Sequence, residues 1–441
     1  MQFNDTTYWL KNARVPASLL AEVPENADRT REDLVMVDVE VREGAIGQIV
    51  ASSQNPETEN LLGLNLRGGQ LWPCFVDLHT HLDKGHVWDR SPNPDGSFNG
   101  AIETCDQDAS QYWDAEDIYR RMEFGLKCSY AHGTKAIRTH LDYLGKHLPD
   151  SWEVFTTLRE EWQDKILLQG VSIVLIDRFG TPEGEKLADR LAEIGGIMGG
   201  MPQMNADLDK QLDRVFSLAM ERSLDLDFHT DESGNPEAMT VRHVAAAALR
   251  HQFSGKIICG HCCSLAVQSP EEVKQTLELV REAGIAIVSL PTCNLYLQDR
   301  QPGRTPRWRG VTLLQEIKAA GIPVALASDN CRDPFYGFGD RDMLEVFTMA
   351  VRIGHLDMPY GDWPNAVTST PADLMRLPEV GKIEEGGPAD LILFKGRTYS
   401  ELLSRHQGDR LVWRRGKAID RTLPDYDQLD DLTARSECTN N

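Results

Sequence analysis

The chain has 441 residues, 41% of them hydrophobic, and its 46 basic and 68 acidic residues give a formal net charge of −22 at pH 7. A chain of this size and composition can bury a large core, and its negative charge disfavours contact with phosphate backbones and anionic lipid surfaces. We therefore expect neither a disordered protein nor one that binds nucleic acid or membranes.

The location in the cell follows from two further features. The sequence contains no run of 18 or more apolar residues, and its start lacks the basic-then-apolar order of a secretion signal. We expect a cytoplasmic protein whose nine scattered cysteines are reduced. Cys262 and Cys263 stand next to a candidate site residue, and small buried core residues are favoured there over zinc thiolates.

Both ends of the chain show short strands broken by glycine and proline. VMVDVEVREGAIGQIV near the start and GKIEEGGPADLILFKG near the end are examples. We expect residues 1–70 and 376–441 to form one small β-sandwich domain, with residues 71–375 inserted between its two parts.

Within the insert, apolar runs of strand length alternate with segments of helical period, which is typical of parallel β/α units. Eight runs are found, at residues 71–81, 134–140, 166–176, 194–200, 224–231, 255–261, 285–291 and 323–330. This pattern predicts an α/β protein with a (β/α)8 TIM-type barrel, and an open doubly wound sheet is the alternative. The glycines of IGGIMGG lack the spacing of a phosphate-binding loop and are interpreted as tight packing.

Polar residues collect where these strands end. They are His79, His81, His140, His229, Glu232, His261 and Asp329. The carboxyl ends of barrel strands meet on one face, so these side chains are expected to lie together, and imidazoles with a carboxylate are metal ligands. His79 and His81 are two residues apart on a strand and should point to the same side.

The motifs PCFVDLHTHLDK, RTHLD, DFHTDE and SDN-x-x-DPF, with the trailing GKIEEGGPADLILF, resemble the amidohydrolase superfamily and, within it, the cytosine deaminase branch. The resemblance covers nearly the whole chain and implies a distorted barrel with a β domain made from both ends. It places the metal ligands on His79, His81, His229 and Asp329. It also implies that Glu232 is the proton-shuttling glutamate and that His261 is a catalytic histidine.

The chemistry of these residue types agrees with those roles. One divalent metal, zinc or iron, would lower the pKa of a bound water toward neutrality. Asp329 would accept the proton of that water, Glu232 would protonate a ring nitrogen and then the leaving ammonia, and His261 would orient the attacked position. A solvated acid at Glu232 and a satisfied core histidine at His261 are the alternatives. The fourth strand lacks the lysine that bridges two metal ions in binuclear members of the superfamily, so the resemblance implies a single metal ion.

Several positions concern the substrate. Leu175 stands where the branch has a glutamine that reads the pyrimidine, Asn330 where it has a second aspartate, and Phe335 where it has a tryptophan. In loops expected over the site, Trp88 is a candidate for stacking on a flat ring and Gln298 for contact with an anionic or oxo-substituted ring. An ordinary surface loop is the alternative for Gln298, and core packing is the alternative for Phe335.

Polar residues near the motifs receive structural interpretations. His140 is expected to give support or packing. Asp83 and Lys84 either shape the mouth of the site or are ordinary solvated loop charges, the latter being the usual case.

The predicted function is hydrolytic deamination of an amino-substituted heterocycle: a pyrimidine, isoguanine, pterin or triazine ring. Hydrolysis of a cyclic amide or of an N-alkylaminotriazine is the enzymatic alternative, and a catalytically silent barrel that binds a ligand is the non-enzymatic one. The expected partner is a small heterocyclic substrate, and analogy with relatives suggests a homo-oligomer.

Overall fold

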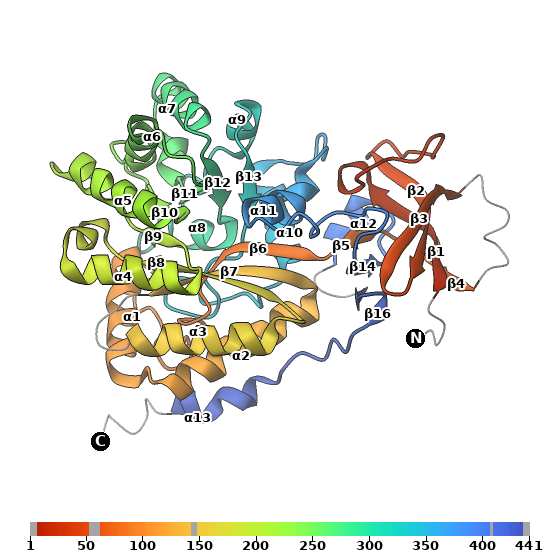
Figure 1. The fold of residues 1–441 in the computed structure, drawn as a ribbon, viewed down its shortest axis with the longest axis horizontal. Helices are drawn as coiled ribbons and strands as arrows, with labels where there is room; N and C mark the ends of the chain where they lie inside the picture. Colours follow the sequence, from red (N-terminus) through yellow and green to blue (C-terminus); the bar gives the residue numbers. More distant parts are fainter. Residues whose placement is uncertain (1–6, 53–61, 143–147, 406–408, 435–441) are drawn as a thin grey trace. The chain divides into compact units, whose positions relative to one another are not determined.

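The computed structural model describes residues 7–52, 62–142, 148–405 and 409–434 (Figure 1). The chain divides into two compact units. The first unit comprises residues 1–77, 127–136 and 341–423, and the second comprises residues 78–126, 137–340 and 424–441.

The first unit contains two four-stranded sheets, with the strand orders β3-β2-β1-β4 and β16-β15-β14-β5. Their strands are β1 (Thr7–Pro16), β2 (Leu34–Arg42), β3 (Ala45–Ala51), β4 (Gly63–Asn65), β5 (Leu71–Pro73), β14 (Leu391–Phe394), β15 (Arg410–Arg414) and β16 (Lys417–Ala418). All the pairs are antiparallel except β1 with β4. Isolated bridges from Leu20 to Ile383 and from Ala45 to Pro388 connect segments from opposite ends of the sequence.

An aromatic cluster around Trp72 forms part of the core of the first unit. The indole ring is fully buried, and four aromatic rings meet it edge-on at centroid distances of 5.7 to 6.3 Å, namely Phe75, Phe347, Phe394 and Tyr399. Edge-to-face pairs of this kind are favoured by the ring quadrupoles. Because these residues come from both ends of the unit's sequence, the cluster ties its segments together.

Helices of the first unit surround this core. They are η1 (Ala17–Leu19), α10 (Met343–Gly354), η7 (Trp363–Val367), α11 (Ser369–Leu374) and α12 (Tyr399–Leu403). Helix α10 begins at the cap Asp342, whose side chain accepts a hydrogen bond from the Leu344 amide.

All eight strands predicted for the insert are present. They are β6 (Phe75–Thr80), preceded by β5 in the same predicted run, β7 (Thr134–Asp142), β8 (Leu167–Ile173), β9 (Met198–Gly200), β10 (Leu226–Thr230), β11 (Ile257–His261), β12 (Ala286–Ser289) and β13 (Val324–Leu326). They form one sheet in the order β6-β7-β8 and a second, parallel sheet in the order β9-β10-β11-β12-β13. The predicted α/β class is therefore confirmed.

Isolated parallel bridges extend this strand order. Val171 pairs with Ile197 and Leu175 with Met201, which joins β8 to the segment of β9. Thr80 pairs with Asp329, which joins the end of β6 to the residues that follow β13. These bridges link the two sheets at both junctions.

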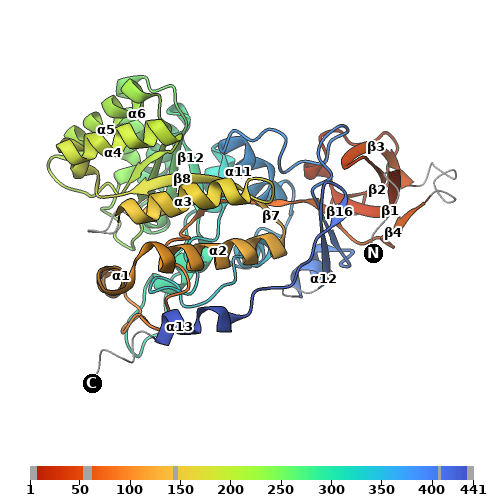
Figure 2. The same ribbon diagram turned by 60° about the horizontal axis from the view of Figure 1, so that its bottom comes forward.

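Helices lie between consecutive strands of the second unit, except the last two, which follow the last strand of the chain. They are α1 (Phe98–Tyr112), α2 (Ala115–His132), α3 (Leu148–Trp162), η5 (Ile176–Gly180), α4 (Pro182–Ile194), α5 (Leu208–Arg222), α6 (Thr240–His251), η6 (Cys263–Val267), α7 (Pro270–Glu282), α8 (Pro291–Leu297), α9 (Leu314–Ala319), η8 (Tyr426–Leu429) and α13 (Asp430–Thr433). Figures 1 and 2 show α4, α5 and α6 side by side, outside the parallel strands. None of the helices in the described ranges is both long and apolar enough to cross a membrane.

The glycines of β9 pack against neighbouring strands, as predicted. A Cβ atom on Gly199 would lie 2.4 Å from a methyl carbon of Val171 and 2.5 Å from the carbonyl oxygen of Asp227. No side chain fits at that distance, so glycine is required for β9 to approach β8 and β10.

Candidate active site

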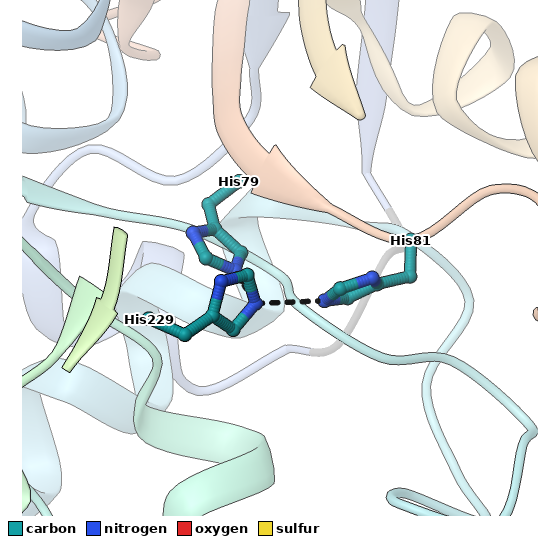
Figure 3. Close-up of side chains that lie close together, drawn as sticks. All are labelled: His79, His81 and His229. Atoms are coloured by element: carbon teal, nitrogen blue, oxygen red, sulfur yellow. Dashed lines mark hydrogen bonds between the residues drawn. The ribbon is translucent and has the colours of Figure 1, made fainter. Parts of the chain in front are cut away.

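Three histidine rings converge at the ends of two strands (Figure 3). His79 and His81 come from the end of β6, and His229 comes from β10. The Nε2 atom of His229 lies 3.1 Å from Nε2 of His79 and 3.4 Å from Nε2 of His81. All three residues are buried. The two-residue spacing of His79 and His81 therefore places both rings on the same side, as expected from strand geometry.

Asp329 completes the group. Its Oδ1 atom lies 3.3 Å from Nε2 of His81 and 3.7 Å from Nε2 of His79. The backbone holds it there, because the Asp329 amide donates to the His79 carbonyl at 2.9 Å and the Thr80 hydroxyl donates to the Asp329 carbonyl at 2.7 Å. These two hydrogen bonds hold Asp329, three residues after β13, against the end of β6.

Ring nitrogens of His79, His81 and His229 all lie within 4.8 Å of one another, as one metal ion would require, and Asp329 lies near two of these rings. A tetrahedral ion with bonds of about 2.1 Å separates its ligand atoms by roughly 3.4 Å. The four measured separations range from 3.1 to 3.7 Å. Burial, together with nearby positive groups, lowers the pKa of His79, His81 and His229 well below the ordinary value, so the rings are neutral, as ligands must be.

Strained backbone accompanies the strand ends. Asp231, His261, Cys262 and Asp329 all have positive φ angles, at 51°, 69°, 48° and 63°. Such conformations cost of order 1 to 3 kcal/mol for non-glycine residues and cluster at functional sites, where the surrounding structure enforces them. Here they turn the chain sharply at the ends of β10 and β11 and after β13, next to the histidine cluster.

A second group of side chains lies beside the first. The Asn294 amide nitrogen is 3.0 Å from Oε1 of Glu232 and 3.0 Å from Nδ1 of His261, and these last two atoms are 3.3 Å apart. Asn294 was not among the residues predicted from the sequence. The only available signal was its position, five residues after the end of β12, where a polar residue reaches the same face as the other strand ends.

The pKa values of Glu232 and His261 differ from those of the same side chains in water. Burial and the negative charge of Asp329 raise the pKa of Glu232 well above its usual range. Burial lowers the pKa of His261 to about 3. The alternative of a solvated acid at Glu232 is wrong, since only 13% of its side chain is exposed.

Lys84 and Asp83 are buried, which corrects the usual interpretation of them as solvated loop charges. Lys84 Nζ lies 2.7 Å from Oδ2 of Asp142, and the amide of Asp142 donates to Asp83 at 2.8 Å. Burial alone would lower the pKa of Lys84, but the surrounding acidic groups, Asp142 foremost among them, together outweigh burial and raise that pKa. Lys84 Nζ also lies 4.9 Å from the Phe335 ring centroid, and its positive charge contributes to the lowered pKa of His79 and His81.

Replacing Lys84 with methionine should lower the free energy of unfolding by about 3 to 5 kcal/mol, because it leaves the buried Asp142 carboxylate without its cation. Urea unfolding measures the change. The exposed pair of Arg190 and Glu193 provides a control, since Arg190→Met should cost less than about 1 kcal/mol. A loss at Lys84 no larger than the control would contradict the structural role of the buried pair.

The residues predicted to contact the substrate differ in their contacts and in their exposure. Gln298 donates to the backbone carbonyl of Glu232 at 3.2 Å, and the Asn330 amide donates to Asp333 at 2.9 Å. Phe335 is half-buried over Lys84, and the Trp88 ring packs against Gly337. Leu175 is 44% exposed at the start of η5.

Two other groups behave as the sequence suggested. The His140 ring packs against that of His79 at a centroid distance of 3.9 Å, and its neighbour Asp227 pairs with Arg138 at 2.9 Å. This arrangement fits a supporting role for His140. Cys262 and Cys263 are buried, and the described cysteines form no disulfide with one another.

The chain is similar to several known proteins. Residues 124–419 match the model of an amidohydrolase family. A pterin deaminase from Rhizobium rhizogenes is 49% identical over 429 residues, which cover 97% of each chain.

The chain belongs to the amidohydrolase family.

More distant relatives of this amidohydrolase include an N-isopropylammelide isopropyl amidohydrolase from a Pseudomonas species, 25% identical over 75% of this chain and 81% of the relative. Among solved structures, a 5-methylcytosine deaminase from Klebsiella pneumoniae shares the fold, with a TM-score of 0.79 and 24% identity over 93% of this chain and 98% of that one.

Proposed function

We propose that this amidohydrolase is a hydrolytic deaminase whose substrate is a pterin. The observation that carries the proposal is the pairing of two groups in one site: three histidine rings close enough to share a metal ion, with Asp329 beside two of them, and a buried glutamic acid nearby. The near full-length similarity to a pterin deaminase supports the choice of ring.

The residues supply the parts of a deamination. A divalent ion held by His79, His81, His229 and Asp329 would make a bound water nucleophilic near neutral pH. Asp329 would accept one proton of the attacking water. Glu232, kept in its acid form by burial, would donate a proton to the ring nitrogen next to the attacked carbon. Glu232 would then take the hydroxyl proton of the adduct as the carbonyl forms and pass it to the amino group, which leaves as ammonia, and the proton held by Asp329 would restore the acid form of Glu232.

His261 and the loops complete the proposal. With a pKa of about 3, His261 stays neutral and orients the oxygen on the attacked carbon by hydrogen bonding. Phe335 and Trp88 would face the flat ring, and Gln298, Asn330 and Leu175 would contribute to its selection. Zinc and iron both suit a set of three imidazoles and one carboxylate.

We also propose that the strands β6 to β13 close into one (β/α)8 barrel and that the ends of the chain form a β-sandwich. The parallel bridges at Thr80 and Val171 support closure, because they link the two sheets at both junctions. The domain limits at residues 70 and 375 belong to the same proposal.

Ammonia release by metal-loaded protein tests the function, with pterin, cytosine, isoguanine and aminotriazines as substrates. We expect kcat/KM for pterin to exceed that for cytosine by about 10²-fold or more, because a site built for polar groups rejects rings that lack them. Faster release from another ring would overturn the choice of pterin.

The same assay addresses the enzymatic alternatives. No ammonia from any ring, with metal bound, would overturn deamination and favour cyclic amide hydrolysis. Isopropylamine release from N-isopropylammelide would instead favour the chemistry named for the Pseudomonas relative.

A further inference from the structure

Asn294 contacts both Glu232 and His261, although it was not among the site residues predicted from the sequence. It lies in α8, which begins at Pro291 directly after β12, and its side chain is almost fully buried. Its own backbone is held in the helix, because its amide donates to the Leu290 carbonyl at 3.0 Å and its carbonyl accepts from the Gln298 amide at 2.9 Å. The side-chain amide is therefore presented from a rigid element.

The amide nitrogen, Oε1 of Glu232 and Nδ1 of His261 form a triangle with sides of 3.0, 3.0 and 3.3 Å. A side-chain amide nitrogen carries two hydrogens, whereas a carboxylate oxygen and an unprotonated imidazole nitrogen are acceptors. One hydrogen can therefore go to Glu232 and the other to His261. Both partners are satisfied by a single group.

Resting on the proposed deaminase function, we propose that Asn294 is a positioning residue that decides which atoms of Glu232 and His261 carry their protons. When Nδ1 of His261 accepts from Asn294, the neutral ring must carry its hydrogen on Nε2. That nitrogen is buried and bonds to no other described residue. The His261 ring lies next to the proposed metal ligands, since His79, His261 and Asp329 each offer an atom within 4.8 Å of the others.

The arrangement also prevents an unproductive pairing. Without Asn294, the Nδ1 hydrogen of His261 could bond directly to Oε1 of Glu232, only 3.3 Å away. His261 would then turn an Nε2 lone pair toward the site, which would repel rather than stabilise a developing negative oxygen. By occupying both acceptors, Asn294 prevents a direct hydrogen bond between His261 and Glu232. The other carboxyl oxygen of Glu232, Oε2, then holds the proton that is transferred.

The test uses Asn294→Asp, which keeps the shape but removes both N–H donors, and Asn294→Ala, which removes the group. Asn205→Asp, at an exposed asparagine, is the control for the added charge. Zinc-loaded protein labelled with ¹⁵N-histidine reports the tautomer of His261 by long-range ¹H–¹⁵N spectra, with the signal assigned by its loss in His261→Gln. Metal content and the kinetics on pterin are measured on the same samples.

We expect the Nε2–H tautomer in the wild type and the Nδ1–H tautomer in both Asn294 variants, with zinc retained. We expect kcat to fall about 10- to 100-fold, as for other residues that orient catalytic groups, while KM changes by less than about threefold. An Nδ1–H tautomer in the wild type, or an unchanged tautomer and kcat in both variants, would overturn the proposal. If the wild type does not turn over pterin, the proposed function fails but the tautomer still decides the role of Asn294.

Discussion

Replacing Glu232 with glutamine should lower kcat for ammonia release by about 10²- to 10⁴-fold while the protein keeps its metal. Glutamine has nearly the same shape and can still accept a hydrogen bond from Asn294, but it cannot give up a proton as a carboxylic acid does. Glu232 is not among the four residues proposed to hold the ion, so metal content should be unchanged. Steady-state ammonia assays and metal analysis of the purified variant measure both quantities.

Glu237→Gln is the matched control, because Glu237 lies five positions further along the same loop and is exposed. Its kcat should stay within about twofold of the wild type, in line with the small effects of surface changes. A Glu232→Gln enzyme with normal turnover would show that another group transfers the proton.

Removing the metal with a chelator should abolish turnover and lower the thermal stability of the protein together. An ion present at about 1,000 times its dissociation constant stabilises the folded state by about 4 kcal/mol, and its removal withdraws that contribution. His229→Ala should reproduce both effects, because the Nε2 atom of His229 lies within 3.4 Å of the corresponding atoms of His79 and His81. Calorimetry and the ammonia assay measure the two effects in parallel.

Restoring the chelated protein with zinc in one sample and iron(II) in another identifies the ion that supports the higher kcat. His243→Ala is the control, since His243 pairs with Asp209 near the surface and belongs to none of the histidine clusters at the strand ends. Full activity in metal-free protein, or in His229→Ala, would contradict the assignment of the metal site.

The expectations of a cytoplasmic location and a homo-oligomer stay predictions.

The order of the strands and the position of the histidines could be read from the sequence, for a physical reason. Alternating apolar runs and helical segments are local patterns, and a residue such as His229 or His261 at the end of a run is at a strand end wherever that strand lies. Parallel strands bring their carboxyl ends to one face, so residues as distant as His79 and Asp329 could be expected to meet.

Which polar side chains are buried, and with what partner, was decided only by the tertiary structure. Lys84 appears as an ordinary loop charge in the sequence, yet it is buried because Asp142, at the end of the next strand, neutralises it. Asn294 bridges Glu232 and His261 from a short helix whose direction no local pattern specifies. The strands and the polar residues at their ends could be predicted from periodicity along the chain, and the resemblance to the amidohydrolase superfamily selected the metal donors among those residues. The protonation of the site depends on contacts between loops and strand ends, which exist only in the folded protein.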